Sequence, residues 1–199
     1  MNIVCLDMEC VLVPEIWIAF ARETNIPELM LTTRDEPDYD KLMKYRINIL
    51  KQHNLGLHEI QAVIEKIDIM PGAKEFLDKL RDITQVIILS DTFEQFARPL
   101  MKKLGMPTIF CNTLEVSKNG EITGYKMRVE KSKLTTVKAL QSIGFDTIAS
   151  GDSYNDLGMI QNSKAGFLFK STDKIKKDYP NIPAFEEYDD LFEAIKDVL

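Results

Sequence analysis

The amino-acid sequence predicts an α/β protein with a doubly wound, mainly parallel, Rossmann-like sheet. Three observations indicate this class: short apolar runs alternate with helix-like stretches, one hairpin pattern interrupts the alternation, and one helical segment is inserted near the start. Strands that alternate with helices form a parallel sheet with helices on both faces. A chain of 199 residues is long enough for one such core and one inserted subdomain.

The predicted strands are short apolar or β-branched runs, and the predicted helices lie between them. We expect strands at 2–7, 84–90, 108–111, 146–151 and 165–169. We expect helices of the core at 72–82, 93–104, 133–143, 155–162 and 188–198. Asn119-Gly120 stands between two alternating runs within 114–127, a pattern typical of a β-hairpin.

The segment 14–70 breaks the alternation of strands and helices. Its apolar residues have helical spacing at 15–22, 38–53 and 57–67, and no part of it reads as a strand. The sequence contains no internal repeat and no low-complexity linker, so we expect this segment to pack on the core. The predicted division is therefore an α/β core of residues 1–13 and 71–199 with a helical cap of residues 14–70.

Composition excludes several classes of protein. The net charge of −6 disfavours nucleic acid as a partner, because phosphate backbones require clustered Lys and Arg. No apolar run is long enough to span a membrane, and the first residues lack the layout of a secretion signal. Three cysteines without paired spacing disfavour a disulfide framework, so we expect a cytoplasmic setting. The oligomeric state stays open between a monomer and a homodimer.

Polar side chains, most of them acidic or hydroxyl groups, gather at the carboxyl ends of three predicted strands. They are Asp7 and Glu9, then Ser90, Asp91 and Thr92, and finally Asp152, Asn155 and Asp156. Each one alone is more simply a turn residue or a helix cap. Because the carboxyl ends of parallel strands meet at one edge of the sheet, their coincidence predicts a site. Grouped carboxylates repel one another unless a cation lies among them, and oxygen ligands of this kind suit Mg²⁺.

Lys133 falls in the first turn of a predicted helix. A cation there faces the positive end of the helix dipole, a penalty of up to about 1 kcal/mol. An exposed lysine beside Lys131 is one interpretation, and a phosphate or carboxylate partner explains the position better.

These motifs together resemble a known superfamily. The segments DMECVLV at 7–13, ILSDT at 88–92 and GDSYND at 151–156, with Lys133, resemble in order the four motifs of the haloacid dehalogenase superfamily of phosphatases. The inserted helices resemble the cap of its phosphoserine phosphatase branch. The chain is most similar to the bifunctional members that also pass the phosphoryl group to homoserine.

The resemblance implies the chemistry of two acids. Asp7 would be the nucleophile that forms an aspartyl-phosphate, which divides one hard hydrolysis into two easier steps. Glu9 would be the general acid and base, at a position where most of the superfamily has Asp. Cys10 replaces the glycine or small residue that often follows, and we assign it no function.

The resemblance also implies a magnesium site and a phosphate site. The metal ligands would be Asp7, the backbone carbonyl of Glu9 and Asp152. Ser90 and Lys133 would hold the phosphate, and Asp156 would orient Lys133 or a metal-bound water. The further substrate-binding residues are Asp91, Thr92 and Asn155.

Arg46 points to the substrate through helix geometry. It falls in the middle of an apolar arc of the helix 38–53. That arc consists of Leu42, Met43, Tyr45, Ile47, Ile49, Leu50 and His53. A buried guanidinium requires an anionic partner, unless the side chain reaches solvent or pairs structurally.

The functional interpretation is a clamp for a substrate carboxylate. Arg46 resembles the carboxylate-binding arginine of phosphoserine phosphatases. Glu15 resembles their ammonium-binding glutamate, although an acid that simply favours the helix start explains it nearly as well. A cation and an anion facing the site predict O-phospho-L-serine as substrate.

Three alternatives stay open at this point. One is a sugar-phosphate or nucleotide phosphatase of the same superfamily, which Arg46 and Glu15 disfavour. Another is a signalling module that carries a long-lived phosphate, which Glu9 and the cap disfavour. The third is a non-catalytic homologue, which the presence of all four motifs disfavours. The sequence does not decide whether water or homoserine accepts the phosphoryl group.

Overall fold

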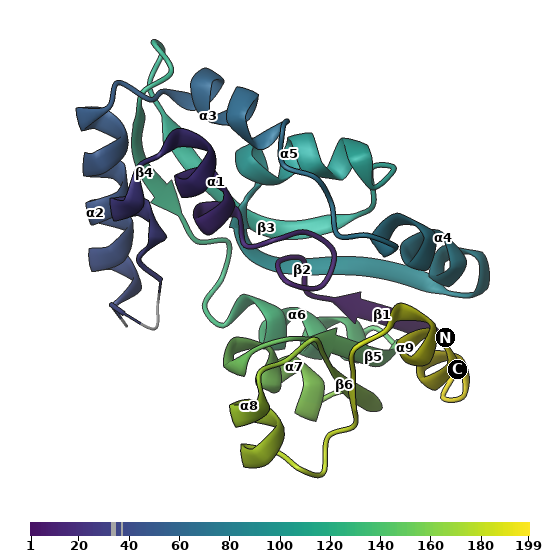
Figure 1. The fold of residues 1–199 in the computed structure, drawn as a ribbon. Coiled ribbons are helices and arrows are strands. Elements are labelled where there is room, and N and C mark those ends of the chain that lie inside the picture. The colour runs from purple at the N-terminus through teal and green to yellow at the C-terminus, as the bar shows by residue number, and fades with distance from the viewer. Residues whose placement is uncertain (33–34, 37) are drawn as a thin grey trace.

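A computed structural model of the protein describes residues 1–32, 35–36 and 38–199. Its described residues form a seven-stranded sheet in the order β4-β3-β2-β1-β5-β6-β7 (Figure 1). The strands are β1 (Asn2–Leu6), β2 (Gln85–Phe93), β3 (Ile109–Val116), β4 (Ile122–Lys126), β5 (Asp146–Gly151), β6 (Ala165–Phe169) and β7 (Ala184–Phe185). Only the β3–β4 pair among them is antiparallel, so the predicted parallel sheet and its hairpin are confirmed.

Helices cover both faces of the sheet. On one face α4 (Ala73–Ile83), α5 (Glu94–Lys103) and α9 (Tyr188–Lys196) contribute to the larger apolar core. On the other face α6 (Ser132–Ser142), α7 (Leu157–Gln161) and α8 (Asp173–Asp178) contribute to a second core. Residues 3–6 of β1 are all apolar because both faces of the strand are buried: Val4 packs in the first core and Cys5 in the second. The doubly wound α/β class is therefore confirmed.

Several predicted boundaries were wrong. β2 extends beyond Ser90 to Phe93, so Asp91 and Thr92 also lie within the strand, where its register with β3 shifts. The predicted strand at 108–111 and the first arm of the hairpin are one strand, β3. The predicted helix at 155–162 begins with a 3₁₀ turn, Tyr154–Asp156. We did not predict α8 and β7, which are too short to carry a periodic pattern.

The segment predicted as a cap is helical in its described residues. It contains α1 (Ile16–Thr24), the 3₁₀ helix η1 (Pro27–Met30), α2 (Tyr39–Gln52) and α3 (Leu57–Ile64). The predicted apolar arc of α2 is narrower than expected, because Tyr45 and His53 are exposed. No helix in the described part of the chain combines the length and the apolar character needed to cross a membrane.

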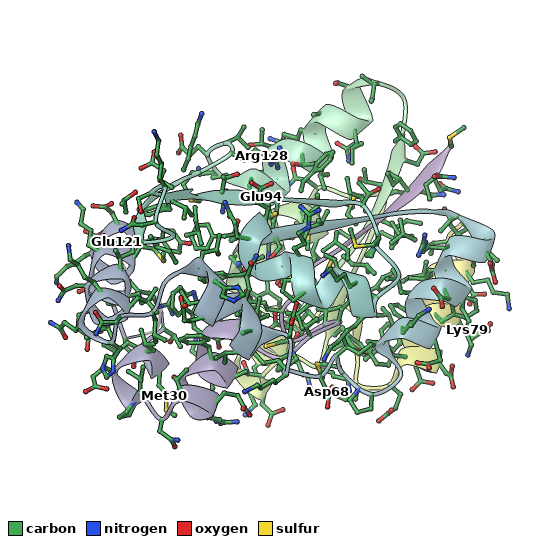
Figure 2. All side chains as sticks on the ribbon, turned by 90° about the horizontal axis from the view of Figure 1, so that it is seen from above. Met30, Asp68, Lys79, Glu94, Glu121 and Arg128 are labelled. Atoms are coloured by element: carbon green, nitrogen blue, oxygen red, sulfur yellow. The ribbon has the colours of Figure 1, made fainter. Side chains whose placement is uncertain are left out.

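The β3–β4 hairpin contacts these inserted helices, and Figure 1 shows β4 beside α2. The hydroxyl of Tyr125 donates to Asp40 Oδ1 at 3.0 Å, and Lys51 forms an ion pair with Glu121 at 3.1 Å. Figure 2 shows Glu121 next to α2. The hairpin therefore packs against the helices of the predicted cap. The division of the chain at residues 14–70 stays a prediction.

Candidate active site

Asp7 follows the last residue of β1, at the carboxyl edge of the sheet. Its amide donates to the carbonyl of Ser150 at 2.9 Å, which continues the pairing of β1 with β5. Its Oδ1 atom accepts a hydrogen bond from the amide of Met8 at 2.7 Å. Its side chain is 7% exposed, and no hydrogen bond from a described residue reaches its Oδ2 atom. This oxygen is therefore available for chemistry.

Lys133 lies between two carboxylates. Its Nζ atom is 2.8 Å from Asp7 Oδ1 and 2.6 Å from Asp156 Oδ1, and its side chain is buried. Burial by itself would lower the pKa of Lys133, but Asp156 and Asp7 outweigh it and raise that pKa. The interpretation as an exposed lysine is therefore wrong. Its two anionic partners offset the unfavourable interaction of Lys133 with the helix dipole.

Asp156 is held in place by the loop that precedes it. Its Oδ2 atom accepts hydrogen bonds from the amides of Asp152 at 3.0 Å and Ser153 at 3.1 Å. Gly151 makes this approach feasible, because a Cβ atom there would lie 2.3 Å from Asp156 Cγ. Since both oxygens of Asp156 are engaged, its geometry fits a residue that orients Lys133.

Three carboxylates gather at this point. Oxygen atoms of Asp7, Asp152 and Asp156 lie within 4.8 Å of one another. Burial, followed by repulsion from Asp156, raises the pKa of Asp7 well above its usual range. The same two causes raise the pKa of Asp152 to about 6. One ammonium group does not balance three carboxylates, so the cluster could hold a cation, with Asp7 and Asp152 as its side-chain ligands.

Glu9 lies in the loop that links β1 to α1. Its Oε2 atom accepts a hydrogen bond from the amide of Ile16, the first residue of α1, at 3.2 Å. Burial raises the pKa of Glu9 to about 7. A carboxyl group with such a pKa can both donate and accept a proton near neutral pH. The longer side chain of glutamate is thus accommodated by the N-terminus of α1.

Cys10, the residue after Glu9, has a backbone conformation that suits glycine. Its φ of 60° lies in the left-handed region, which glycine adopts without strain and other residues adopt at about 1–2 kcal/mol. Burial raises the pKa of its thiol to about 12, so the thiol is protonated at neutral pH.

The end of β2 carries three more of the predicted site residues. The hydroxyl of Ser90 accepts a hydrogen bond from the amide of Thr92 at 3.2 Å. Neither Ser90 nor Asp91 caps α5, whose N-cap residue is Phe93 and has no side-chain cap, so that interpretation is wrong. Asp91 Oδ1 accepts from Ser132 Oγ at 2.7 Å, and its Oδ2 accepts from Asn155 Nδ2 at 3.1 Å.

Arg46 approaches from the inserted helices. It is 4% exposed, so the solvent-reaching interpretation is wrong. Its guanidinium carbon lies 4.5 Å from the ring centre of Trp17, and its Nη2 atom donates to the carbonyl of Leu31 at 2.7 Å. Its Nε atom is buried and has no hydrogen-bond partner among the described residues. Burial lowers the pKa of Arg46, while Tyr39 and Glu15 act in the opposite direction.

One cleft of about 800 Å³ is lined by residues from all of these segments. It is lined by ten of the predicted residues: Asp7, Glu9, Glu15, Arg46, Ser90, Asp91, Thr92, Lys133, Asp152 and Asn155. Asp156 lies behind Lys133 and does not line it. Glu15 is the N-cap residue of α1, so its place at the helix start and its place in the cleft are compatible.

Sequence reasoning missed several residues that line this cleft. They are Trp17, Thr32, Tyr39, Phe93, Met127, Lys131, Ser132, Leu134, Ser153, Tyr154 and Gly158, in addition to Cys10. A weak signal existed for Trp17, the single tryptophan, because it lies two residues after Glu15. Tyr39 opens α2 on the same helix as Arg46, but its direction could not be read from periodicity.

A family model of the haloacid dehalogenase-like hydrolases matches residues 17–161. The chain belongs to the haloacid dehalogenase-like hydrolase family. The resemblance drawn from the four motifs is thereby confirmed. The matched region contains the second, third and fourth motifs, and the first motif precedes it.

Two relatives in this family are close in sequence. Phosphoserine phosphatase ThrH of Pseudomonas aeruginosa is 49% identical over 191 residues, which cover 96% of this chain and 93% of the relative. A phosphoserine phosphatase of Pseudomonas syringae pv. tomato is 48% identical over 190 residues, with coverages of 96% and 80%. The predicted likeness to the phosphoserine phosphatase branch is therefore confirmed.

Solved structures share the fold at lower identity. A phosphoserine phosphatase in its substrate-bound complex has a TM-score of 0.78 at 22% identity, and covers 98% of this chain and 97% of its own. A phospho-aspartyl intermediate analogue of phosphoserine phosphatase has a TM-score of 0.74 at 22% identity, with 92% of each chain covered. At these identities the likeness shows the fold alone.

Proposed function

We propose that this chain hydrolyses O-phospho-L-serine with Mg²⁺, through a phosphate carried covalently on Asp7. The observation that carries the proposal is that one cleft is lined by Asp7 and Lys133 together with Glu15 and Arg46. Such a cleft offers groups for a phosphate and also groups for an amino acid. The names of the two Pseudomonas relatives support the same substrate.

In the first step, Asp7 Oδ2 attacks the phosphorus atom of the substrate. The bond from phosphorus to the serine oxygen breaks, and the protonated carboxyl of Glu9 supplies the proton that the departing serine oxygen needs. Lys133 and Ser90 stabilise the charge on the phosphoryl oxygens as the group moves. The products of this step are serine and the aspartyl-phosphate.

In the second step, Glu9 acts in the opposite sense. It takes a proton from a water molecule, whose oxygen attacks the phosphorus atom. The bond to Asp7 breaks, inorganic phosphate leaves, and both carboxyl groups return to their first states. A pKa of about 7 suits Glu9 to both roles.

The carboxylate cluster fits a magnesium ion, because its oxygen donors match the preference of that metal. The side chains of Asp7 and Asp152 and the backbone carbonyl of Glu9 would hold it. A bound ion would supply positive charge at the phosphate, and it would counter the carboxylate repulsion that, after burial, raises the pKa of Asp7.

Substrate choice rests on the inserted helices. Arg46 is the buried cation available for the substrate carboxylate, and Glu15 is the anion for its ammonium group. A sugar phosphate or a nucleotide lacks this pair of charges.

The acceptor of the phosphoryl group is a separate question. Homoserine, an alcohol of the same amino-acid type, fits the proposed substrate groups, and an aligned alcohol reaches effective molarities of about 10⁵ M or more. The resemblance to bifunctional enzymes favours transfer to homoserine as a second activity.

Phosphate release from phosphoserine, measured with and without Mg²⁺ and then with homoserine present, tests the proposal. We expect turnover that requires Mg²⁺, and phosphohomoserine as an added product identifies the transferase. Equal turnover of sugar phosphates or nucleotides would contradict the substrate. A long-lived phosphoprotein without turnover would indicate the signalling module, and no reaction with any substrate would indicate the non-catalytic homologue.

A further inference from the structure

Asp91 joins the first turn of α6 to the 3₁₀ turn after β5, two segments that carry site residues and are distant in sequence. Its Oδ1 atom accepts from the hydroxyl of Ser132, the residue before Lys133, at 2.7 Å. Its Oδ2 atom accepts from the side-chain amide of Asn155, which lies between Asp152 and Asp156, at 3.1 Å. The end of β2 thus holds both segments through one carboxylate. We call Asp91, Ser132 and Asn155 the Asp91 clasp.

A buried asparagine extends the clasp to the hairpin. Asn112 is 1% exposed, and its Nδ2 atom donates to the backbone carbonyl of Asp91 at 2.9 Å. Its Oδ1 atom accepts from the amide of Arg128 at 3.0 Å, just beyond β4. Arg128 in turn donates to Thr136 of α6 at 2.6 Å; it is labelled in Figure 2. The segment that leads from the hairpin to Lys133 is therefore fixed at both ends.

Lys133 needs such support for a local reason. The residue before α6, Lys131, has a φ of 48° and offers no side-chain cap to the helix. Lys133 itself faces the positive end of the α6 dipole. Neither the backbone conformation nor the dipole favours the observed position, so contacts from elsewhere must stabilise it.

We propose that Asp91 is a positioning residue, which fixes Lys133 and the Asp152 loop relative to Asp7. The proposal rests on the function proposed for Asp7, and it assigns Asp91 a role different from contact with substrate. Both of its carboxylate oxygens are engaged by protein groups, which agrees with this role. Displacement of a catalytic group by about 1 Å lowers turnover by about 100-fold.

The test uses five single variants and one double variant, Asp91→Ala with Ser132→Ala. Asp91→Ala removes both arms of the clasp, while Ser132→Ala and Asn155→Ala remove one arm each. Asp91→Asn keeps both contacts, because its amide oxygen accepts from Asn155 and its amide nitrogen donates to the hydroxyl of Ser132. Asp78→Ala is the matched control, since Asp78 makes surface ion pairs on α4 with Lys74 and Arg81.

The first readout is backbone amide exchange in the protein without substrate. In Asp91→Ala we expect faster exchange in both 130–136 and 152–157. In Ser132→Ala only the first segment exchanges faster, and in Asn155→Ala only the second. Asp78→Ala leaves both unchanged. Unchanged exchange in Asp91→Ala would overturn the proposal.

The second readout is turnover of p-nitrophenyl phosphate and of phosphoserine. We expect Asp91→Ala to lose about 10- to 100-fold in kcat with little change in KM, and Asp91→Asn to recover most of that loss. Because the two arms act through one residue, adding Ser132→Ala to Asp91→Ala costs little more. If Asp91 instead contacts substrate, Asp91→Ala raises KM for phosphoserine, whereas Ser132→Ala and Asn155→Ala leave kcat unchanged. That result would overturn the proposal.

Failure of the proposed function would look different. A wild-type protein that hydrolyses p-nitrophenyl phosphate but not phosphoserine would contradict the substrate. The exchange and the p-nitrophenyl phosphate measurements would still test the clasp.

Discussion

The ammonium group of Lys133 lies 2.8 Å from the Oδ1 atom of Asp7, and both side chains are buried. An attacking carboxylate must be ionised, yet burial and the nearby Asp156 raise the pKa of Asp7. Lys133 acts against both causes and lowers that pKa. We therefore propose that contact with Lys133, which Asp156 holds in place, favours the ionised form of Asp7 that acts as nucleophile.

Replacement of Glu9 by glutamine tests its role as general acid. Glutamine can still accept the hydrogen bond from Ile16, but it cannot supply a proton. We expect kcat for phosphoserine to fall by about 10²–10⁴. Nitrophenolate leaves without a proton, so p-nitrophenyl phosphate should give a burst of one equivalent followed by slow turnover. Loss of the burst itself would contradict the role.

Replacement of Arg46 by alanine tests the carboxylate clamp. A charged hydrogen bond is worth about 1.5–3 kcal/mol, so we expect KM for phosphoserine to rise by about 10- to 100-fold. KM for p-nitrophenyl phosphate, which has no carboxylate, should change little. Arg46→Lys serves as the control that keeps the charge and loses the planar fork. An equal rise for both substrates would refute the clamp.

Replacement of Gly151 by alanine tests the placement of Asp156. The added Cβ would meet Asp156 Cγ at 2.3 Å, and such overpacking costs about 1–3 kcal/mol of stability. Because Asp156 orients Lys133, kcat should fall as well. Gly144→Ala is the control: its φ of 90° strains an alanine, but nothing lies within 4 Å of the new atom. That control should lower the melting temperature and leave kcat unchanged; a matching loss of kcat would contradict the argument.

Replacement of Asp152 by asparagine tests the cation site through pH. The folded protein raises the pKa of Asp152 from 3.8 to about 6, so this group destabilises the fold as pH rises through that window. In the presence of a chelator, the free energy of unfolding of Asp152→Asn should rise relative to that of the wild type as the pH increases from about 4 to about 6. The expected difference is on the order of 2–3 kcal/mol.

Addition of Mg²⁺ should make the wild type the more stable of the two proteins, because we expect only the wild type to bind the ion tightly and to be stabilised by it. Denaturant unfolding at each pH measures both effects. A variant that Mg²⁺ stabilises as much as the wild type would show that Asp152 is not a ligand.

The sheet could be predicted because its central strands are buried on both faces. Residues 3–6, before Asp7, are all apolar, residues 147–151 are all buried, and acids of the site follow both runs. Such runs are visible without any tertiary information. β2 was predicted three residues short, since the polar residues Asp91 and Thr92 hide the continuation of the strand to Phe93, where it pairs with β3.

Other features depend on contacts between distant residues. α8 is held by the burial of Ile175 and by the pairing of Asp178 with Tyr154, neither of which leaves a periodic pattern. The hydrogen bond of Asp91 with Asn155 joins residues 64 positions apart. The exposure of Tyr45 was likewise unpredictable, because a helical wheel gives the apolar arc but not how much of it a neighbour covers.

The central claim is the covalent phosphate on Asp7, and rapid acid quench followed by peptide mapping tests it most directly. Phosphoserine labelled in its phosphate is mixed with the protein and Mg²⁺, and the quenched protein is digested. The account predicts label on the peptide that contains Asp7, absent from the Asp7→Asn variant, which should also be inactive. Label on another residue, or turnover by Asp7→Asn, would contradict it.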